Sequence, residues 1–133
     1  MQLVVLYLST AVLFLGLDAV MLSRVIRPLF ERHVGDLLAD NLRLGAAAVF
    51  YLFYVAGVIW LVSWPALKAG QPMQALWQGA VLGALAYGTY EFTNFATLRG
   101  WHPAMVATDL IWGTVLTGVS AWTGVLIAGA IAR

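Results

Sequence analysis

Long uninterrupted runs of apolar residues alternate with short polar segments along the chain. Four such runs stand out, at residues 3–22, 44–64, 75–98 and 104–131. Roughly 20 helical residues, rising about 1.5 Å each, cross a hydrocarbon core of about 30 Å. A transmembrane strand would instead show about 10 residues of alternating polarity. The pattern therefore predicts an all-α polytopic membrane protein, with residues 1–133 forming a single domain that is a bundle of four transmembrane helices.

The connections between these runs differ in character. In the longest, residues 24–43, arginine and acidic residues alternate with apolar ones. This mixture predicts a short amphipathic, interfacial helix between the first and second spans. Residues 65–74 and 99–103 are expected to be short turns, because proline and glycine punctuate them. The start, Met1-Gln2-Leu3, lacks the basic leader of a secretory signal, so we expect the first run to remain as a helix of the mature protein.

Basic residues gather at one end of this predicted bundle. The first and third connections share a side and hold five arginines: Arg24, Arg27, Arg32, Arg43 and Arg99. The opposite end holds Lys68, Arg133 and the amino terminus. Because cytoplasmic loops carry the excess of Lys and Arg, both termini are expected on the outer side of the membrane. Three tryptophans would then mark the outer interface: Trp60, Trp64 and Trp77.

The composition restricts the chemistry. The chain is 62% hydrophobic and 10% charged, whereas globular domains average about 45–50% apolar and about 25% charged residues. A net charge of +1, with no basic stripe, argues against binding to nucleic acid. There is no cysteine, and neither His33 nor His102 has a second ligand four residues away, so no metal site is predicted. No phosphate-binding glycine loop or nucleophile elbow is present, and no cofactor is expected.

Three acidic residues lie inside the apolar runs, where a carboxylate costs about 2.5–3.5 kcal/mol on insertion scales. Asp18 is six residues before Arg24, Glu91 eight before Arg99, and Asp109 seven after His102. At the helical rise these positions are all roughly 9–12 Å below the cytoplasmic boundary. The sequence therefore predicts that the three carboxyl groups lie in one layer.

Other polar side chains fall near the same layer. Tyr51 and Tyr54 lie in the first half of the second helix, and Tyr87, Glu91 and Asn94 follow one stripe of the third at i, i+4 and i+7. We predict a ligand-binding cavity in the cytoplasmic half of the bundle, with catalytic residues unassigned. Its predicted lining is Asp18, Tyr51, Tyr54, Tyr87, Glu91, Asn94 and Asp109.

Small and hydroxyl residues have a structural interpretation. Thr89, Thr93, Thr117 and Ser120 suit hydrogen bonds between helices, worth about 0.6 kcal/mol each on average. Ala75, Gly79 and Gly83 recur every fourth residue, so a neighbouring helix can approach closely. That neighbour is either another helix of the chain or a second subunit.

Three segments carry a resemblance to a known family: residues 86–99 (AYGTYEFTNFATLR), 50–54 (FYLFY) and 109–113 (DLIWG). They resemble a family of small bacterial four-helix inner-membrane proteins classed as a domain of unknown function. The resemblance covers essentially the whole chain and implies a location in the bacterial inner (cytoplasmic) membrane. It also implies that aspartate is usual at the position of Glu91, and an association with genes for modifying membrane fatty acids. It supplies no reaction.

Three functions remain open on these grounds. The first is binding or transport of a small solute, an ion or a lipid headgroup at the acidic cavity, with membrane lipid as a partner. Four helices make a narrow pathway, so transport would favour a homodimer. The second is a membrane-embedded lipid-modifying enzyme, with an acid as general base and a tyrosine as proton donor. The third is an accessory subunit of a membrane complex, whose polar groups only join helices and whose residues 24–43 dock a cytoplasmic partner or anionic lipid.

Overall fold

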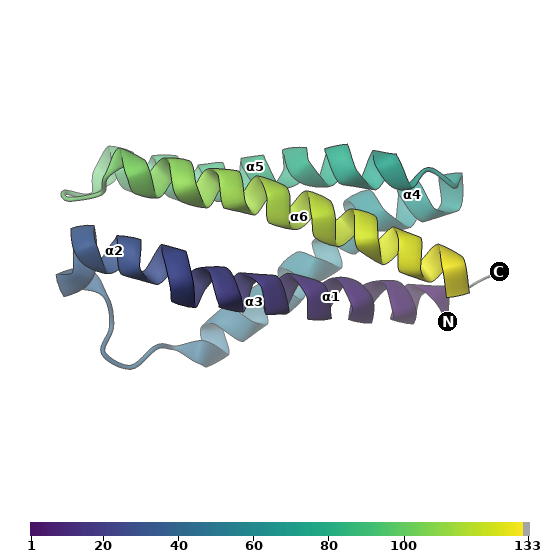
Figure 1. Ribbon diagram of the computed structural model, residues 1–133, viewed down its shortest axis with the longest axis horizontal. Coiled ribbons are helices and arrows are strands. Elements are labelled where there is room, and N and C mark those ends of the chain that lie inside the picture. The colour runs from purple at the N-terminus through teal and green to yellow at the C-terminus, as the bar shows by residue number, and fades with distance from the viewer. Residues whose placement is uncertain (132–133) are drawn as a thin grey trace.

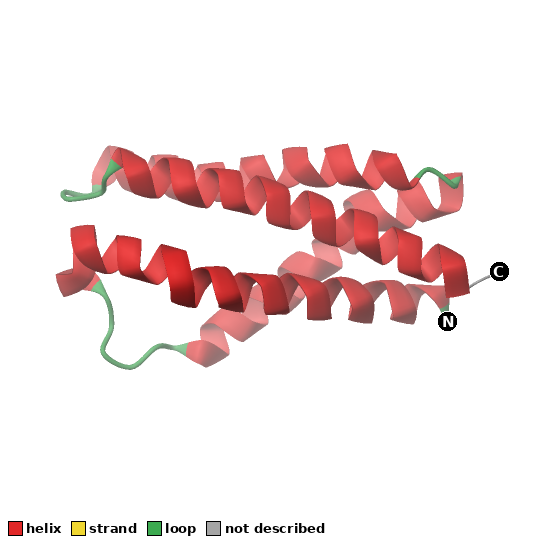
Figure 2. Ribbon diagram, viewed as in Figure 1, coloured by secondary structure: helices red, strands yellow, loops and turns green. Residues whose placement is uncertain are grey.

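The computed structural model describes residues 1–131, which fold into four long helical rods joined by short connections (Figures 1 and 2). No strand occurs in this described part. The first rod consists of α1 (Gln2–Met21), the π-helical turn η1 (Leu22–Ile26), α2 (Arg27–Val34) and the 3-10 turn η2 (Gly35–Leu37). The second comprises α3 (Leu44–Val58), the π-helical turn η3 (Ile59–Ser63) and α4 (Trp64–Ala69). The third and fourth rods are α5 (Pro72–Thr97) and α6 (Pro103–Ile131).

Successive rods run in opposite directions. The connections at residues 38–43 and 98–102 lie at one end of the bundle (Figure 1). The turn between α4 and α5, the amino terminus and the end of α6 lie at the other. Arg133, which contributes to the expected orientation, lies outside the described residues.

Three of the rods are long and apolar enough to cross a membrane: residues 2–37, 44–69 and 103–131. The fold is thus an all-α membrane bundle, as the apolar runs predict. Within residues 1–131, α5 is not among these three, although its 26 residues exceed the length of a span. Its hydropathy is reduced by polar side chains: Gln74, Gln78, Glu91 and Asn94.

Two prolines continue a helix instead of ending it. Pro28 and Pro65 each lie at the first turn of a helix that directly follows a π turn. Proline has no N–H and its ring clashes with the carbonyl four residues earlier in a regular α-helix. In both places a π-helical bond comes directly before the proline, from the Arg27 N–H to the Leu22 carbonyl and from the Trp64 N–H to the Ile59 carbonyl. The segment 65–74, predicted as a turn, is therefore helical to Ala69. Similarly, the helix expected between the first two spans is present as α2, and it continues the line of α1 (Figure 1).

The second rod ends at Gly70, whose φ of 66° is the left-handed conformation that favours glycine. The Gly70 N–H donates to the Leu67 carbonyl (3.1 Å) and the Gln71 N–H donates to the Ala66 carbonyl (3.0 Å). These two bonds form a Schellman motif, which satisfies carbonyls left free at the helix end. Pro72 then begins α5.

Helices α5 and α6 pack closely through small residues. A Cβ on Gly79 would lie 3.0 Å from the Gly118 Cα, and one on Gly118 would lie 2.8 Å from the Leu76 carbonyl oxygen. The stripe of small residues in α5 therefore serves packing inside the chain, one of its two predicted roles. In contrast, every residue from 44 to 50 is exposed, because the first half of α3 diverges from the other rods (Figure 1).

Candidate functional site

The three carboxyl groups predicted to lie in one layer come from three different helices. Asp18 of α1, Glu91 of α5 and Asp109 of α6 are 3%, 0% and 8% exposed. The ion pair found within residues 1–131 is Arg27–Glu31, on the exposed face of α2. No arginine or lysine in this range therefore forms an ion pair with a buried carboxyl group.

Indole N–H groups are the donors to two of these acids. Trp112 Nε1 donates to Asp18 Oδ1 (3.0 Å), which joins α6 to α1. Trp101 Nε1 donates to Glu91 Oε1 (3.0 Å), which joins the connection before α6 to α5. An indole is a neutral donor, so each bond satisfies one oxygen and leaves the charge of the carboxylate uncompensated.

The second oxygen of Glu91 is the least satisfied polar atom of the site. Glu91 Oε2 is buried and has no hydrogen-bond partner. The Asp109 side chain is its acidic neighbour across the interface of α5 and α6, and Asp18 is the next acid beyond Asp109. Neighbouring carboxylates repel each other, so this arrangement favours a proton or a cationic group between them.

Tyrosines surround the acids on the side of α3. Tyr51 lies beside Asp18. The hydroxyls of Tyr54 and Thr117 are hydrogen-bonded at 2.9 Å, and the Tyr54 and Tyr87 rings are inclined at 71° with 6.4 Å between centroids. Tyr87 covers Gly113, where its ring would collide with any Cβ.

Five of the seven predicted site residues neighbour one another: Asp18, Tyr51, Tyr87, Glu91 and Asp109. Tyr54 is joined to them through the Tyr87 ring, and Asn94 lies at the edge. Asn94 is half-buried and neighbours the exposed Tyr90. Binding of a ligand by these seven side chains stays a prediction.

Trp101 and Trp112 belong to the site but were not among the residues predicted for it. A usable signal existed, because buried carboxyl groups without a cation need donors, and indoles are donors in otherwise apolar segments. Trp112 follows Asp109 by three residues on α6. Trp101 lies in a short connection, where sequence gives no direction for its side chain.

The end of the bundle near Glu91 is closed by contacts between α2 and the connection before α6. Trp101 meets Phe30 edge-on at 5.3 Å, and the His33 and His102 rings stack at 4.2 Å with 17° between their planes. The Ala104 N–H donates to His102 Nδ1 (3.0 Å). Desolvation, the neighbouring His102 and the adjacent Arg32 lower the pKa of His33 from its ordinary value of 6.5.

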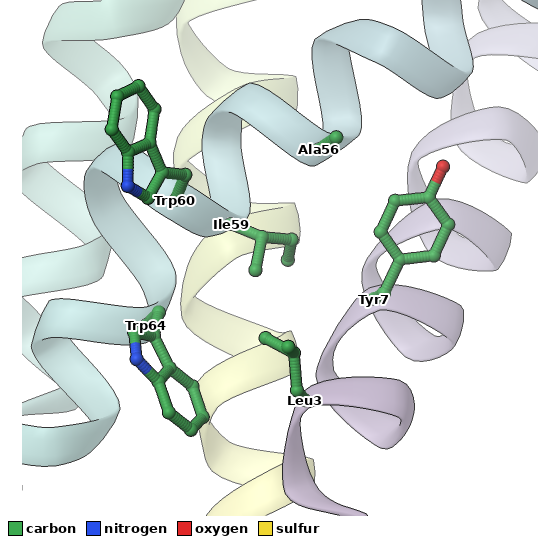
Figure 3. Close-up of a pocket in the computed structure, with 6 residues that line it drawn as sticks. All are labelled: Leu3, Tyr7, Ala56, Ile59, Trp60 and Trp64. Carbon is green, nitrogen blue, oxygen red and sulfur yellow. The ribbon is translucent and has the colours of Figure 1, made fainter.

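Two cavities lie away from the acids. One of about 380 Å³ opens between α1 and the second rod near the amino terminus (Figure 3). Another of about 320 Å³ lies between the second rod and α5, and neither is lined by an acidic residue. Among residues 1–131, no three potential ligands are close enough together to hold a metal ion.

Comparison with protein-family models identifies a family for this chain. The family model described as "Predicted membrane protein (DUF2177)" matches residues 3–126. No curated protein and no solved structure matches the chain.

Proposed function

The chain belongs to the predicted membrane protein family DUF2177, and we propose that it binds a small cationic or hydrogen-bond-donating ligand at three carboxyl groups inside the bilayer. The ligand is a solute or a lipid headgroup with an amine or hydroxyl group. One observation carries this proposal: Asp18, Glu91 and Asp109 are buried together without an ion-pair partner among the described residues.

The energetics of the bilayer support this proposal. Each ionised carboxyl group at mid-membrane costs about 2.5–3.5 kcal/mol on insertion scales. The two indole bonds reduce that cost without removing the charge. Protons neutralise the acids when the site is empty. A hydroxyl group of the ligand forms a hydrogen bond with a protonated acid, whereas an ammonium group replaces a proton when it binds. Such an exchange is also what proton-coupled transport requires.

The ligand enters sideways, between α1 and α3. Residues 44–50 of α3 are exposed and the Tyr51 ring is half-buried in front of Asp18. On the opposite side the carboxyl groups are covered by the close contact of α5 with α6. Tyr51 is therefore the side chain that a ligand has to pass.

The proposal includes a membrane arrangement. Helix α5 crosses as the fourth span, because its 26 residues are sufficient and it packs along α6. Arginines cluster at the end of the connections 38–43 and 98–102, which becomes the cytoplasmic end of an inner-membrane protein. Both termini are then on the outer side.

A structural role is the second candidate, favoured by a specific observation. The Trp112–Asp18 and Trp101–Glu91 bonds each join separate parts of the chain. Polar groups that only join helices would suit an accessory subunit of a membrane complex. In that case the acids would stabilise the fold and bind nothing.

The melting temperature of the purified protein in detergent distinguishes the two candidates. It is measured with ethanolamine or choline and compared with the value in sodium chloride at the same concentration. With binding, ethanolamine raises the melting temperature of the wild type, and Glu91→Gln abolishes this rise. The apo melting temperature of the variant stays near that of the wild type, because the amide keeps an oxygen for Trp101. Glu31→Gln, in the exposed pair with Arg27, is the matched control and keeps the response.

The opposite results favour the structural role. A wild type that responds to neither amine, together with a Glu91→Gln variant that melts well below it, would leave the acids as internal joints. A response that Glu91→Gln retains in full would remove Glu91 from the binding site.

A further inference from the structure

The cavity near the amino terminus lies at the end of the bundle opposite to the carboxyl groups. It is lined by residues of α1 and of the second rod: Leu3, Tyr7, Ala56, Ile59, Trp60 and Trp64. Figure 3 shows Leu3 and Tyr7 of α1 opposite Ile59, Trp60 and Trp64. Its volume of about 380 Å³ is within the range of about 300–1,000 Å³ that is usual for small-molecule sites.

Local structure explains why the cavity exists. The π turn η3 begins at Ile59 and widens the second rod at this level. Ala56, one turn earlier, contributes a single methyl group, so the space between the rods at this level is not filled. Both features are built into the backbone and the sequence of the rod.

The walls of the cavity select a hydrocarbon occupant. The Tyr7 hydroxyl donates to the Leu52 carbonyl (2.9 Å), so its proton is already used. The other lining side chains are aliphatic or indole groups. In a membrane-spanning chain the abundant hydrocarbon that fits beside such walls is an acyl chain.

A cation lies one turn beyond the rim. Lys68 follows Trp64 by four residues, about 6 Å along the helix, and its Nζ lies 5.7 Å from the centroid of the Trp64 ring. It forms no ion pair within residues 1–131. Tryptophan is typical of the interface, and lysine extends its ammonium group to the headgroup level. The order from Ala56 to Lys68 matches that of a lipid, from acyl chain to phosphate.

We propose that this cavity is a binding site for an anionic phospholipid, with one acyl chain between α1 and the second rod and the phosphate paired with Lys68. The site is independent of the carboxyl layer and goes beyond the proposed function. Lys68 gives it a preference for anionic over zwitterionic lipids of about fivefold, which is the effect of one basic residue near a charged membrane surface.

Native mass spectrometry of the delipidated protein, titrated with phosphatidylglycerol or phosphatidylcholine, tests the site. The wild type is expected to bind one lipid before the others, with the preference given above. Ala56→Phe fills the cavity and removes this first binding step for both lipids. Lys68→Gln keeps the step and loses the preference. Val12→Phe enlarges a side chain that is 72% exposed elsewhere on α1, and is expected to bind as the wild type does.

Fluorescence gives a second measurement that does not depend on filling the cavity. The protein is placed in nanodiscs of phosphatidylcholine that contain a small fraction of phosphatidylglycerol with brominated acyl chains. Quenching of tryptophan fluorescence by the brominated lipid should exceed the quenching expected from random contact. Trp64→Phe reduces this excess and leaves the part that comes from Trp60, which also lines the cavity. Trp77→Phe, at an exposed position on α5, retains it in full. Equal first-step binding by Ala56→Phe and the wild type, or equal excess quenching in Trp64→Phe, would overturn the proposal.

Discussion

Two indole rings reach two of the buried carboxyl groups from different parts of the chain. Trp112 fixes Asp18 to α6, and Trp101 fixes Glu91 to the connection that begins at Leu98. Asp109, between them, has acidic neighbours on both sides. The site therefore has fixed donors at its edges and, beside Asp109, one buried Glu91 oxygen without a partner, where a proton or a ligand group would lie.

Trp101→Phe tests the hydrogen bond between Trp101 and Glu91. The substitution keeps an aromatic ring against Phe30 but leaves Glu91 Oε1 buried without a donor. An unpaired buried acceptor costs about 1–3 kcal/mol, so the variant should unfold at lower denaturant in an SDS titration. Glu91→Leu should remove most of this difference, because the acceptor is then absent.

Trp60→Phe is the control, because Trp60 is 75% exposed, and it should unfold as the wild type does. If Trp101→Phe were as stable as that control, the bond to Glu91 would have no energetic role.

The acids of the site can be predicted from the sequence, but their hydrogen-bond donors cannot. Counting residues along each helix brings the three acids to one layer. The donors, however, depend on how a connection and a rotamer fold back, which local sequence does not specify.

The interface between α5 and α6 depends on glycines at which a methyl group does not fit. A Cβ on Gly83 would lie 2.8 Å from Thr117 Oγ1 and still closer to the Gly113 carbonyl oxygen. Gly83→Ala should therefore destabilise the bundle by about 1–3 kcal/mol, the usual effect of overpacking. Chemical unfolding in micelles measures this difference.

Gly16→Ala is the matched comparison, because nothing lies within 4 Å of its added Cβ. Alanine is preferred over glycine inside a helix by about 0.5–1 kcal/mol, so this variant should be at least as stable as the wild type. Equal stability of the two variants would contradict the close packing of α5 on α6.

The rods can be predicted from the sequence because the length of an apolar run determines whether it forms a long helix. The second and fourth rods begin within one residue of the predicted runs. The first and second rods instead extend well past the predicted ends, to Leu37 and Ala69. Proline is expected to end a helix, and the π turns that accommodate Pro28 and Pro65 have no signature in hydropathy. The ends of these two rods therefore depend on backbone hydrogen bonding, which the apolar pattern does not reveal.

The contact of α2 with the connection before α6 is expected to weaken in acid. The pKa of His33 is lowered in the folded chain, so the unfolded chain binds more protons and stability rises with pH. This stability is present above the unfolded pKa of about 6.5, and is lost as the pH falls through the folded value. Melting temperatures between pH 8 and pH 5 measure the loss.

His33→Phe keeps an aromatic ring for stacking on His102 and removes the titrating group. Its melting temperature should fall less than that of the wild type over the same pH interval. His102 Nδ1 accepts the Ala104 N–H, so His102→Asn is a useful second variant that retains an acceptor near this position. A wild type whose melting temperature is the same at pH 8 and pH 5 would show that the stacked pair does not respond to protons.

The two ends of the bundle differ in chemistry. One carries the arginines, the stacked histidines and, one layer deeper, the three carboxyl groups. The other carries Lys68, the tryptophans of the second rod and the apolar cavity. Ligand exchange at the acids and lipid binding at the cavity would therefore occur near opposite faces of the membrane, and the orientation of the chain decides which compartment each one meets.

This orientation is directly measurable because the chain contains no cysteine. Gln71→Cys introduces a thiol in the turn between α4 and α5, and Asp36→Cys introduces one beyond α2. If the arginine-rich end faces the cytoplasm, a membrane-impermeant maleimide should label Gln71→Cys in intact spheroplasts. Asp36→Cys should be labelled only after lysis. The reverse labelling pattern would make the carboxyl layer open toward the outer side, and any proton exchanged there would come from outside the cell.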